Sequence, residues 1–149
     1  MSKLLTFLDL DRADRFATIE AMARIAWAQW LVRAVAPRHW RSQFGTRADE
    51  AGARSRGSGD LATIRRIRLA ISRALRNLPG EPACLPQALA ARRMLERRGI
   101  AAQLFIGTMR DETGIPRFHA WLKVGDEWVT GMCDESRYTL FTRTGAEPA

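Results

Sequence analysis

The chain has 149 residues, 46% hydrophobic and 27% charged, which is enough for one soluble globular domain and too little for two of ordinary size. The net charge of +8 comes almost entirely from arginine, because Lys3 and Lys123 are the only lysines. Such a surface suits nucleic acid, an acidic peptide or an anionic membrane face and selects none of them. Two cysteines are too few for a disulfide framework and favour a reducing cytoplasm.

No secretory or membrane-spanning segment is expected. Residues 1–16 carry acidic side chains directly after a short apolar run and lack the small-residue cleavage site of a signal peptide. The most apolar stretch, Ile25 to Val32, is bracketed by Arg24 and Arg33 and is far too short to span a bilayer. We therefore expect a cytoplasmic protein without an integral membrane segment.

The N-terminal half is predicted to be helical. Residues 4–8 fit either a short strand or the lead-in to a helix. From about Asp11 to Val35, apolar residues recur at three- and four-residue steps until Pro37 ends the pattern. Trp27 and Trp30 on this helix could mark a partner groove or a peripheral membrane contact. We expect them to pack in the core, as large aromatic side chains usually do.

A polar stretch separates this helix from the next. His39 and Trp40 are expected in a short helix or turn that closes at Gly45. Residues 46–60 are small and polar with no apolar periodicity, which predicts a mobile loop rather than a domain boundary. Leu61 to Leu78 is predicted to be an amphipathic helix. The arginines on its other faces are interpreted as solvated rather than as phosphate ligands.

A cysteine opens the most informative helix. Residues 78–83 contain two prolines and a glycine and are expected to enter as a turn. The run from Cys84 to Gly99 then predicts a helix, since Pro86 suits its first turn and Gly99 its C-terminal cap. Free backbone N–H groups and the positive end of the helix dipole would stabilise a thiolate at Cys84. This is a position for a nucleophile; the alternative is a small packed core cysteine.

After this helix the hydrophobic period changes from 3.6 to 2, which predicts an antiparallel sheet. A turn is expected at 110–117 and a tight turn at Gly125-Asp126. The expected strands are 100–109, 118–124, 127–130 and 138–142. Helices followed by an antiparallel sheet, with the Cys84 helix packed on it, make the fold class α+β.

One of the two histidines, His119, lies in the second expected strand. Alternation gives this strand two faces, with His119, Trp121 and Lys123 on one and Phe118, Ala120, Leu122 and Val124 on the other. If the face with Ala120 meets the helix, His119 points away from Cys84; if the other does, a Cys–His pair can form. Such a pair performs thiol acyl transfer, while a structural histidine is the alternative.

A third residue should orient the imidazole through its other nitrogen. With Gly125-Asp126 as a two-residue loop, Trp121 pairs with Thr130. Asp126 then lies roughly 20 Å from His119, at ~3.3 Å per residue, whereas Asp134 closely follows the position opposite His119. We therefore favour Asp134. The full set of candidates is Asp126, Asp134 and Glu135, with Thr130 as a polar fallback.

Three alternatives to an enzyme are a structural zinc site, a nucleic-acid binder and a non-catalytic adaptor. A zinc site would need Cys84, Cys133, His39 and His119, which lack the close-spaced pairs that structural zinc favours. A nucleic-acid binder would need an arginine stripe with stacking aromatics, whereas the tryptophans here fall mainly on apolar faces. A non-catalytic basic adaptor, which binds a leader peptide or a partner protein, stays as the alternative.

The motifs also resemble a known family. Residues 84–107 (CLPQALAARRMLERRGIAAQLFIG), 118–131 (FHAWLKVGDEWVTG) and 138–141 (YTLF) are similar to the stand-alone leader peptidase of lasso-peptide biosynthesis, a member of the transglutaminase-like cysteine protease superfamily. The likeness covers nearly the whole chain. It implies a transglutaminase-like, papain-like fold and a Cys–His–Asp protease that removes the leader from a ribosomally made precursor.

Carried over by motif, Cys84 matches the family's nucleophile and His119 its general acid and base. Family members commonly place an aspartate about where the third strand ends, and here that stretch reads Val129-Thr130-Gly131-Met132. Either Asp134 takes that role from slightly further on, or the triad is reduced to a dyad.

The resemblance further implies partners and no cofactor or metal. A leader-recognition protein would present the precursor in trans, since the helical N-terminal half offers no β-ribbon to pair with a leader. An asparagine-synthetase-like cyclase would then close the macrolactam ring; no nucleic acid is expected. We expect one leader-peptidase domain over 1–149, with a helical region at 1–45, the loop at 46–60 and the catalytic core at 61–149.

Overall fold

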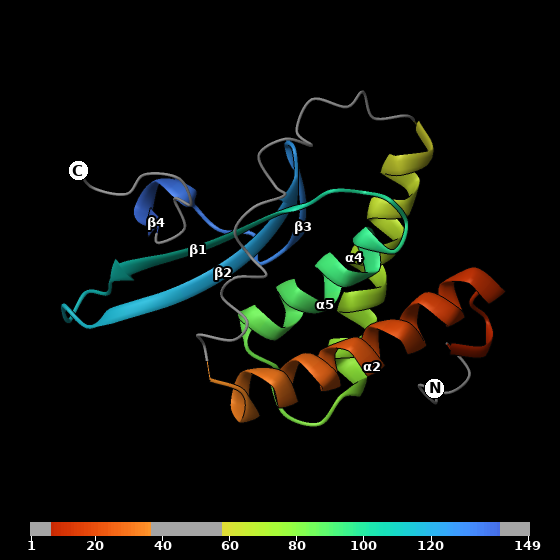
Figure 1. Cartoon of the computed structure of the whole chain (residues 1–149), viewed down its shortest axis with the longest axis horizontal. Coiled ribbons are helices and arrows are strands. Elements are labelled where there is room, and N and C mark those ends of the chain that lie inside the picture. The colour runs from red at the N-terminus through yellow and green to blue at the C-terminus, as the bar shows by residue number, and fades with distance from the viewer. Residues whose placement is uncertain (1–6, 37–57, 141–149) are drawn as a thin grey trace.

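The computed structural model describes residues 7–36 and 58–140 (Figure 1). Its long helices are α2 (Arg12–Ala34), α4 (Ser58–Asn77) and α5 (Cys84–Glu96). They precede a four-stranded antiparallel sheet of β1 (Gln103–Arg110), β2 (Pro116–Val124), β3 (Glu127–Thr130) and β4 (Thr139–Leu140), in the order β3-β2-β1-β4. The expected α+β class is confirmed. No helix in 7–36 or 58–140 is long and apolar enough to cross a bilayer.

Helix α2 begins and ends where its sequence predicts, but it buries an unexpected face. The Asp11 carboxylate caps it by accepting the Asp14 N–H at 2.7 Å. The buried residues are mostly small, namely Ala17, Thr18, Ala21, Ile25 and Ala28, and this lets α4 and α5 approach closely. The aromatic side chains are left outside, so that Trp30 is 60% exposed and Trp27 38%. The expectation that both tryptophans pack in the core is wrong.

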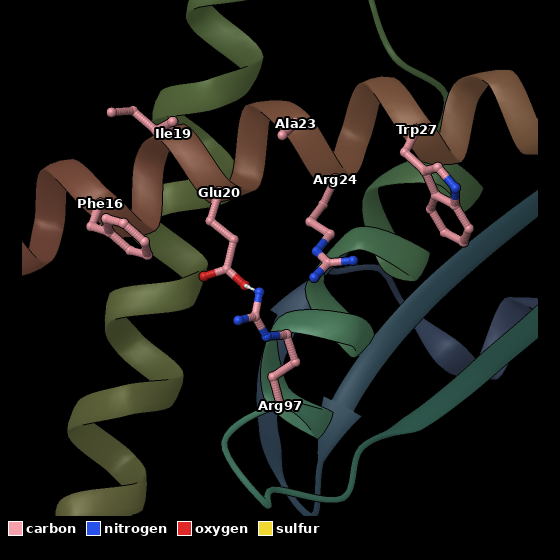
Figure 2. A pocket seen from close by; sticks show the side chains of 7 residues that line it. All are labelled: Phe16, Ile19, Glu20, Ala23, Arg24, Trp27 and Arg97. Atoms are coloured by element: carbon pink, nitrogen blue, oxygen red, sulfur yellow. Dashed lines mark hydrogen bonds and ion pairs between the residues drawn. The ribbon is translucent and has the colours of Figure 1, made fainter.

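The outer face of α2 borders a shallow groove of about 370 Å³ (Figure 2). Glu20 links α2 to the segment just after α5, because its carboxylate lies 2.8 Å from Arg98 Nη2 and 3.3 Å from Arg97 Nη1. Arg93 lies 5.7 Å above the Trp27 ring. The groove is lined by Phe16, Ile19, Glu20, Ala23, Arg24, Trp27 and Arg97.

The core lies between the helices and one face of the sheet (Figure 1). Helix α4 begins three residues before the predicted start at Leu61 and buries its isoleucine stripe, as expected. Most of the predicted loop at 46–60, and also His39, Trp40 and Gly45, lie outside the described residues. The largest side chains of the core are Ile25, Ile64, Ile67, Met94, Leu95 and Leu122.

The sheet has one departure from regular pairing. The tight turn at Gly125-Asp126 is confirmed by the pairing of Val124 with Glu127. A β-bulge between Leu122 and Lys123 then shifts the register, so that Thr130 pairs with Leu122. The expected pairing of Trp121 with Thr130 is therefore wrong by one residue, because a local turn fixes register only until a bulge intervenes.

Candidate active site

Cys84 is the first residue of α5. Gly80, with φ of +76°, turns the chain before the helix, and the Gln87 side chain donates to the Pro82 carbonyl at 2.7 Å. The N-cap Ala83 offers no side-chain hydrogen bond. In a first helical turn the N–H groups of Cys84 and Leu85 have no acceptor within the helix. Half-buried Cys84 thus lies at the positive end of the helix dipole.

The Cys84 thiol also contacts the sheet. Its Sγ accepts the Ala120 N–H at a nitrogen–sulfur distance of 3.4 Å. Ala120 directly follows His119 in β2, so the fold brings the two candidate catalytic residues to neighbouring positions although they lie 35 positions apart in the chain.

Of the two orientations considered for β2, the structure has the one in which the face with Ala120 meets the helices and His119 lies on the opposite face. Leu122 and Val124 belong to the core under the helices, whereas His119 and Trp121 contact Tyr138 on the opposite face. In the described residues no hydrogen bond joins the Cys84 thiol to the His119 ring. The thiol instead meets β2 at the Ala120 amide, beyond the point where pairing with β3 stops.

The His119 ring is held from several sides. Its Nε2 lies 2.8 Å from the Gly131 carbonyl oxygen. The ring centroid lies 5.8 Å from that of Trp121, in a stacked arrangement, and 5.7 Å from that of Tyr138. Phe105 stacks on Trp121 in turn at 5.7 Å. Gly131, Phe105 and Tyr138 were not predicted from the sequence as neighbours of the site.

Glu135 fixes this aromatic cluster. Its Oε1 accepts the Trp121 Nε1–H at 2.8 Å, and its Oε2 lies 3.0 Å from Lys123 Nζ. Burial alone would raise the pKa of this carboxyl. The hydrogen bonds from Trp121 and Lys123, with the Lys123 charge, outweigh that effect and lower the pKa. Glu135 therefore supports Trp121 rather than contacting His119 itself.

The other candidates for the orienting role lie elsewhere. Asp134 caps the short 3₁₀ helix η2 (Glu135–Arg137). Its Oδ1 accepts hydrogen bonds from the Ser136 hydroxyl at 2.6 Å and from the Ser136 backbone N–H at 3.1 Å, and these bonds lower the pKa of Asp134. Asp126 lies in the exposed hairpin turn. Thr130 Oγ1 is buried and has no hydrogen-bond partner in the described part of the chain. None of these side chains hydrogen-bonds His119 there, so the role of Asp134 stays a prediction.

The second cysteine differs from the first. Burial raises the pKa of the Cys133 thiol, and the charges of Glu135 and Asp134 add to this more than Lys123 offsets. Both cysteines are free thiols. In residues 7–36 and 58–140 no three His, Cys, Asp or Glu side chains are grouped so as to hold a metal ion. His39, which the zinc alternative needs, lies outside the described residues.

Comparison with known proteins assigns a family. The sequence profile of the transglutaminase-like superfamily matches residues 28–143, which include α4, α5 and the whole sheet. No curated protein and no solved structure matches the chain. Members of this superfamily include cysteine proteases and transglutaminases. By its fold and by this match over most of its length, the chain belongs to the transglutaminase-like superfamily.

Proposed function

We propose that this chain is a cysteine peptidase with Cys84 as nucleophile and His119 as general acid and base. The observation that carries the proposal is the Cys84 Sγ at the start of α5, 3.4 Å from the amide of the residue that follows His119. Superfamily membership supports the same chemistry. In the described residues the His119 ring lies on the face of β2 opposite the helices and shares no hydrogen bond with the Cys84 thiol, so the proposal requires substrate binding to bring the two groups together.

The proposed reaction has two halves. The Cys84 thiolate attacks the carbonyl carbon of the scissile peptide bond, and the free N–H groups at the start of α5 stabilise the oxyanion. The His119 imidazolium gives its proton to the leaving amine as the C–N bond breaks, which leaves a thioester. Water then attacks the thioester, neutral His119 takes the proton of that water, and the carboxylic acid product leaves Cys84 as thiolate.

We further propose that the substrate is the leader of a lasso-peptide precursor. The support is the resemblance of residues 84–107 and 118–131 to the leader peptidases of that pathway. A recognition protein would present the precursor in trans, and the macrolactam cyclase would act on the released core. The apolar outer face of α2, with Phe16, Ile19 and Trp30 exposed, offers a surface for such a protein.

Cleavage of a precursor tests the enzyme proposal. The chain is incubated with a precursor and its recognition protein, and the products are identified by mass spectrometry. Cys84→Ala should reduce cleavage to background, because this variant lacks the thiol proposed to form the thioester. The matched control, Cys133→Ser, should cleave as the wild type does. Cleavage by Cys84→Ala at the wild-type rate would contradict the proposal.

Binding measurements test whether the exposed face of α2 contacts the recognition protein. Trp30→Ala should weaken association with the recognition protein by about tenfold or more, as loss of an interface aromatic commonly does. Leu69→Ala on α4, 50% exposed, is the control. The proposal fails if the chain alone binds leader as tightly as the mixture does. Leader binding in trans without cleavage would favour the adaptor, for which the same exposed face of α2 is the supporting observation.

A further inference from the structure

We infer that the backbone carbonyl of Gly131 orients the His119 ring, a role for which the family resemblance implies an aspartate side chain. Gly131 falls in the stretch, Val129 to Met132, where the family pattern leads one to expect that aspartate. The inference rests on the proposed function and deepens it, because it names the group that holds the general base. Gly131 is a positioning residue in this account.

The hydrogen bond fixes the protonation of the ring. His119 Nε2 lies 2.8 Å from the Gly131 oxygen, and a carbonyl oxygen can only accept. Nε2 therefore carries a hydrogen in both the neutral and the charged ring. In neutral His119 the lone pair is on Nδ1, which is then the nitrogen that takes the proton from the thiol or from water.

The aromatic cluster keeps the ring in this position. Trp121 stacks on His119 with an interplanar angle of 24°, and Tyr138 lies against the ring at 5.7 Å. Trp121 is itself 1% exposed and is anchored by its hydrogen bond to Glu135. A ring held in this way can be oriented by one neutral acceptor.

Only glycine allows the carbonyl to reach the ring. Gly131 has φ of +70°, a conformation that other residues rarely adopt. A Cβ at this position would lie 2.5 Å from the Ala120 carbonyl oxygen and 3.0 Å from Trp121 Cβ. An aspartate therefore does not fit this backbone. Ala120 contacts both ends of the site, since its N–H holds Cys84 and its carbonyl packs against Gly131.

The ring tautomer gives a test that does not depend on peptidase activity. A full-length chain carrying Cys84→Ala and His39→Gln has His119 as its only histidine, free of proton exchange with the thiol. Long-range ¹H–¹⁵N correlation spectra of the ¹⁵N-histidine-labelled chain then report the tautomer of the neutral ring. We expect the Nε2–H form to predominate.

The acceptor is then weakened without changing any side chain. Incorporation of the α-hydroxy analogue of methionine at 132 converts the Gly131–Met132 peptide bond into an ester, whose carbonyl accepts poorly. Met132 is 72% exposed, and its N–H makes no backbone hydrogen bond in the described residues, so little else is lost. We expect the two tautomers to become mixed. In the chain that retains Cys84, kcat should fall about tenfold with KM unchanged.

Malic acid at 134 is the matched control, because it places an ester between Cys133 and Asp134 and leaves the Gly131 carbonyl intact; both readouts should stay at wild-type values. Asp134→Asn keeps a capping acceptor and should also change neither.

The inference is overturned if the neutral ring carries its proton on Nδ1, if the ester at 132 changes nothing, or if Asp134→Asn shifts the tautomers instead. A chain whose tautomers respond as expected but which cleaves no peptide would refute the proposed function and leave the orientation of His119 standing.

Discussion

The two faces of β2 differ in what they contact: one packs in the core, and the other carries His119, the proposed general acid and base. On one face Leu122 and Val124 pack under the helices in an apolar core. On the other, His119 and Trp121 contact Tyr138, the Gly131 carbonyl and Glu135. Because successive side chains of a strand alternate, a few residues can serve both purposes without sharing a contact. Substitutions on the two faces should therefore produce separable effects.

The largest effect is expected from His119→Ala. Loss of the proposed general acid and base should lower kcat/KM by about 10²- to 10⁴-fold. The melting temperature should change little, because the ring is only half-buried and faces away from the core. Steady-state kinetics and thermal unfolding of the same preparation check this. A large loss of stability with unchanged kinetics would reverse the assignment of the two faces.

Leu122→Ala tests the other face. This fully buried side chain lies in the core, and its truncation should destabilise the fold by about 2–5 kcal/mol. The kcat of the folded fraction should be retained. Denaturant unfolding measures the free energy, with Ile115→Ala in the β1–β2 turn, 52% exposed, as a control expected within about 0.5 kcal/mol of wild type. Equal losses in the two variants would contradict the comparison.

A smaller effect is expected where Trp121 meets Glu135. Trp121→Phe keeps an aromatic ring beside His119 but removes the indole N–H that bonds Glu135 at 2.8 Å. A double-mutant cycle with Glu135→Ala should give a coupling of about 1 kcal/mol, since one end of the bond is partly exposed. We expect kcat to fall several-fold, because the support of His119 is loosened. A coupling of zero would show that the bond does not anchor Trp121.

The smallest effect concerns the turn between β1 and β2. The Thr113 hydroxyl, Arg117 and the backbone N–H groups of Thr113 and Ile115 together outweigh burial and lower the pKa of Asp111 from 3.8 to about 2. A depressed carboxyl pKa contributes stability above the unfolded value, and that contribution is lost as pH falls from about 4 towards 2. Asp111→Asn should therefore flatten the fall of the melting temperature over this range. An unchanged slope would contradict the assignment, and activity at pH 7 serves as the control.

Local signals in the sequence predicted the elements well. Apolar periodicity from about Asp11 to Val35, Pro86 in a first turn and Gly99 as a stop gave the bounds of α2 and α5 to within about three residues, because each is a local signal. The tight turn at Gly125-Asp126 and the strand Glu127–Thr130 were likewise predictable. Alternation also assigned the faces of β2, although it did not say which face the helix covers.

What escaped prediction depends on packing between distant segments. Trp27 and Trp30 lie on the same helix as the buried alanines Ala17, Ala21 and Ala28. The packing of α4 and α5 against α2 buries the alanines and leaves the tryptophans exposed. The bulge at Leu122 shifted the register that a hairpin loop alone would set. Gly131 contributes a carbonyl, which every residue has, so only its positive φ distinguishes it. A glycine directly after a strand was the one available signal.

The central claim is that Cys84 is an activated thiol paired with His119, and alkylation tests it most directly. In a Cys133→Ser background Cys84 is the only cysteine, and its rate of reaction with iodoacetamide is measured across pH with and without His119→Ala. We predict rapid labelling of Cys84 that is slowed by loss of His119. Cys133, whose pKa is raised, should react slowly in a Cys84→Ala chain. Slow labelling of Cys84 at a rate that His119→Ala does not change would mean a packed cysteine and would contradict the claim.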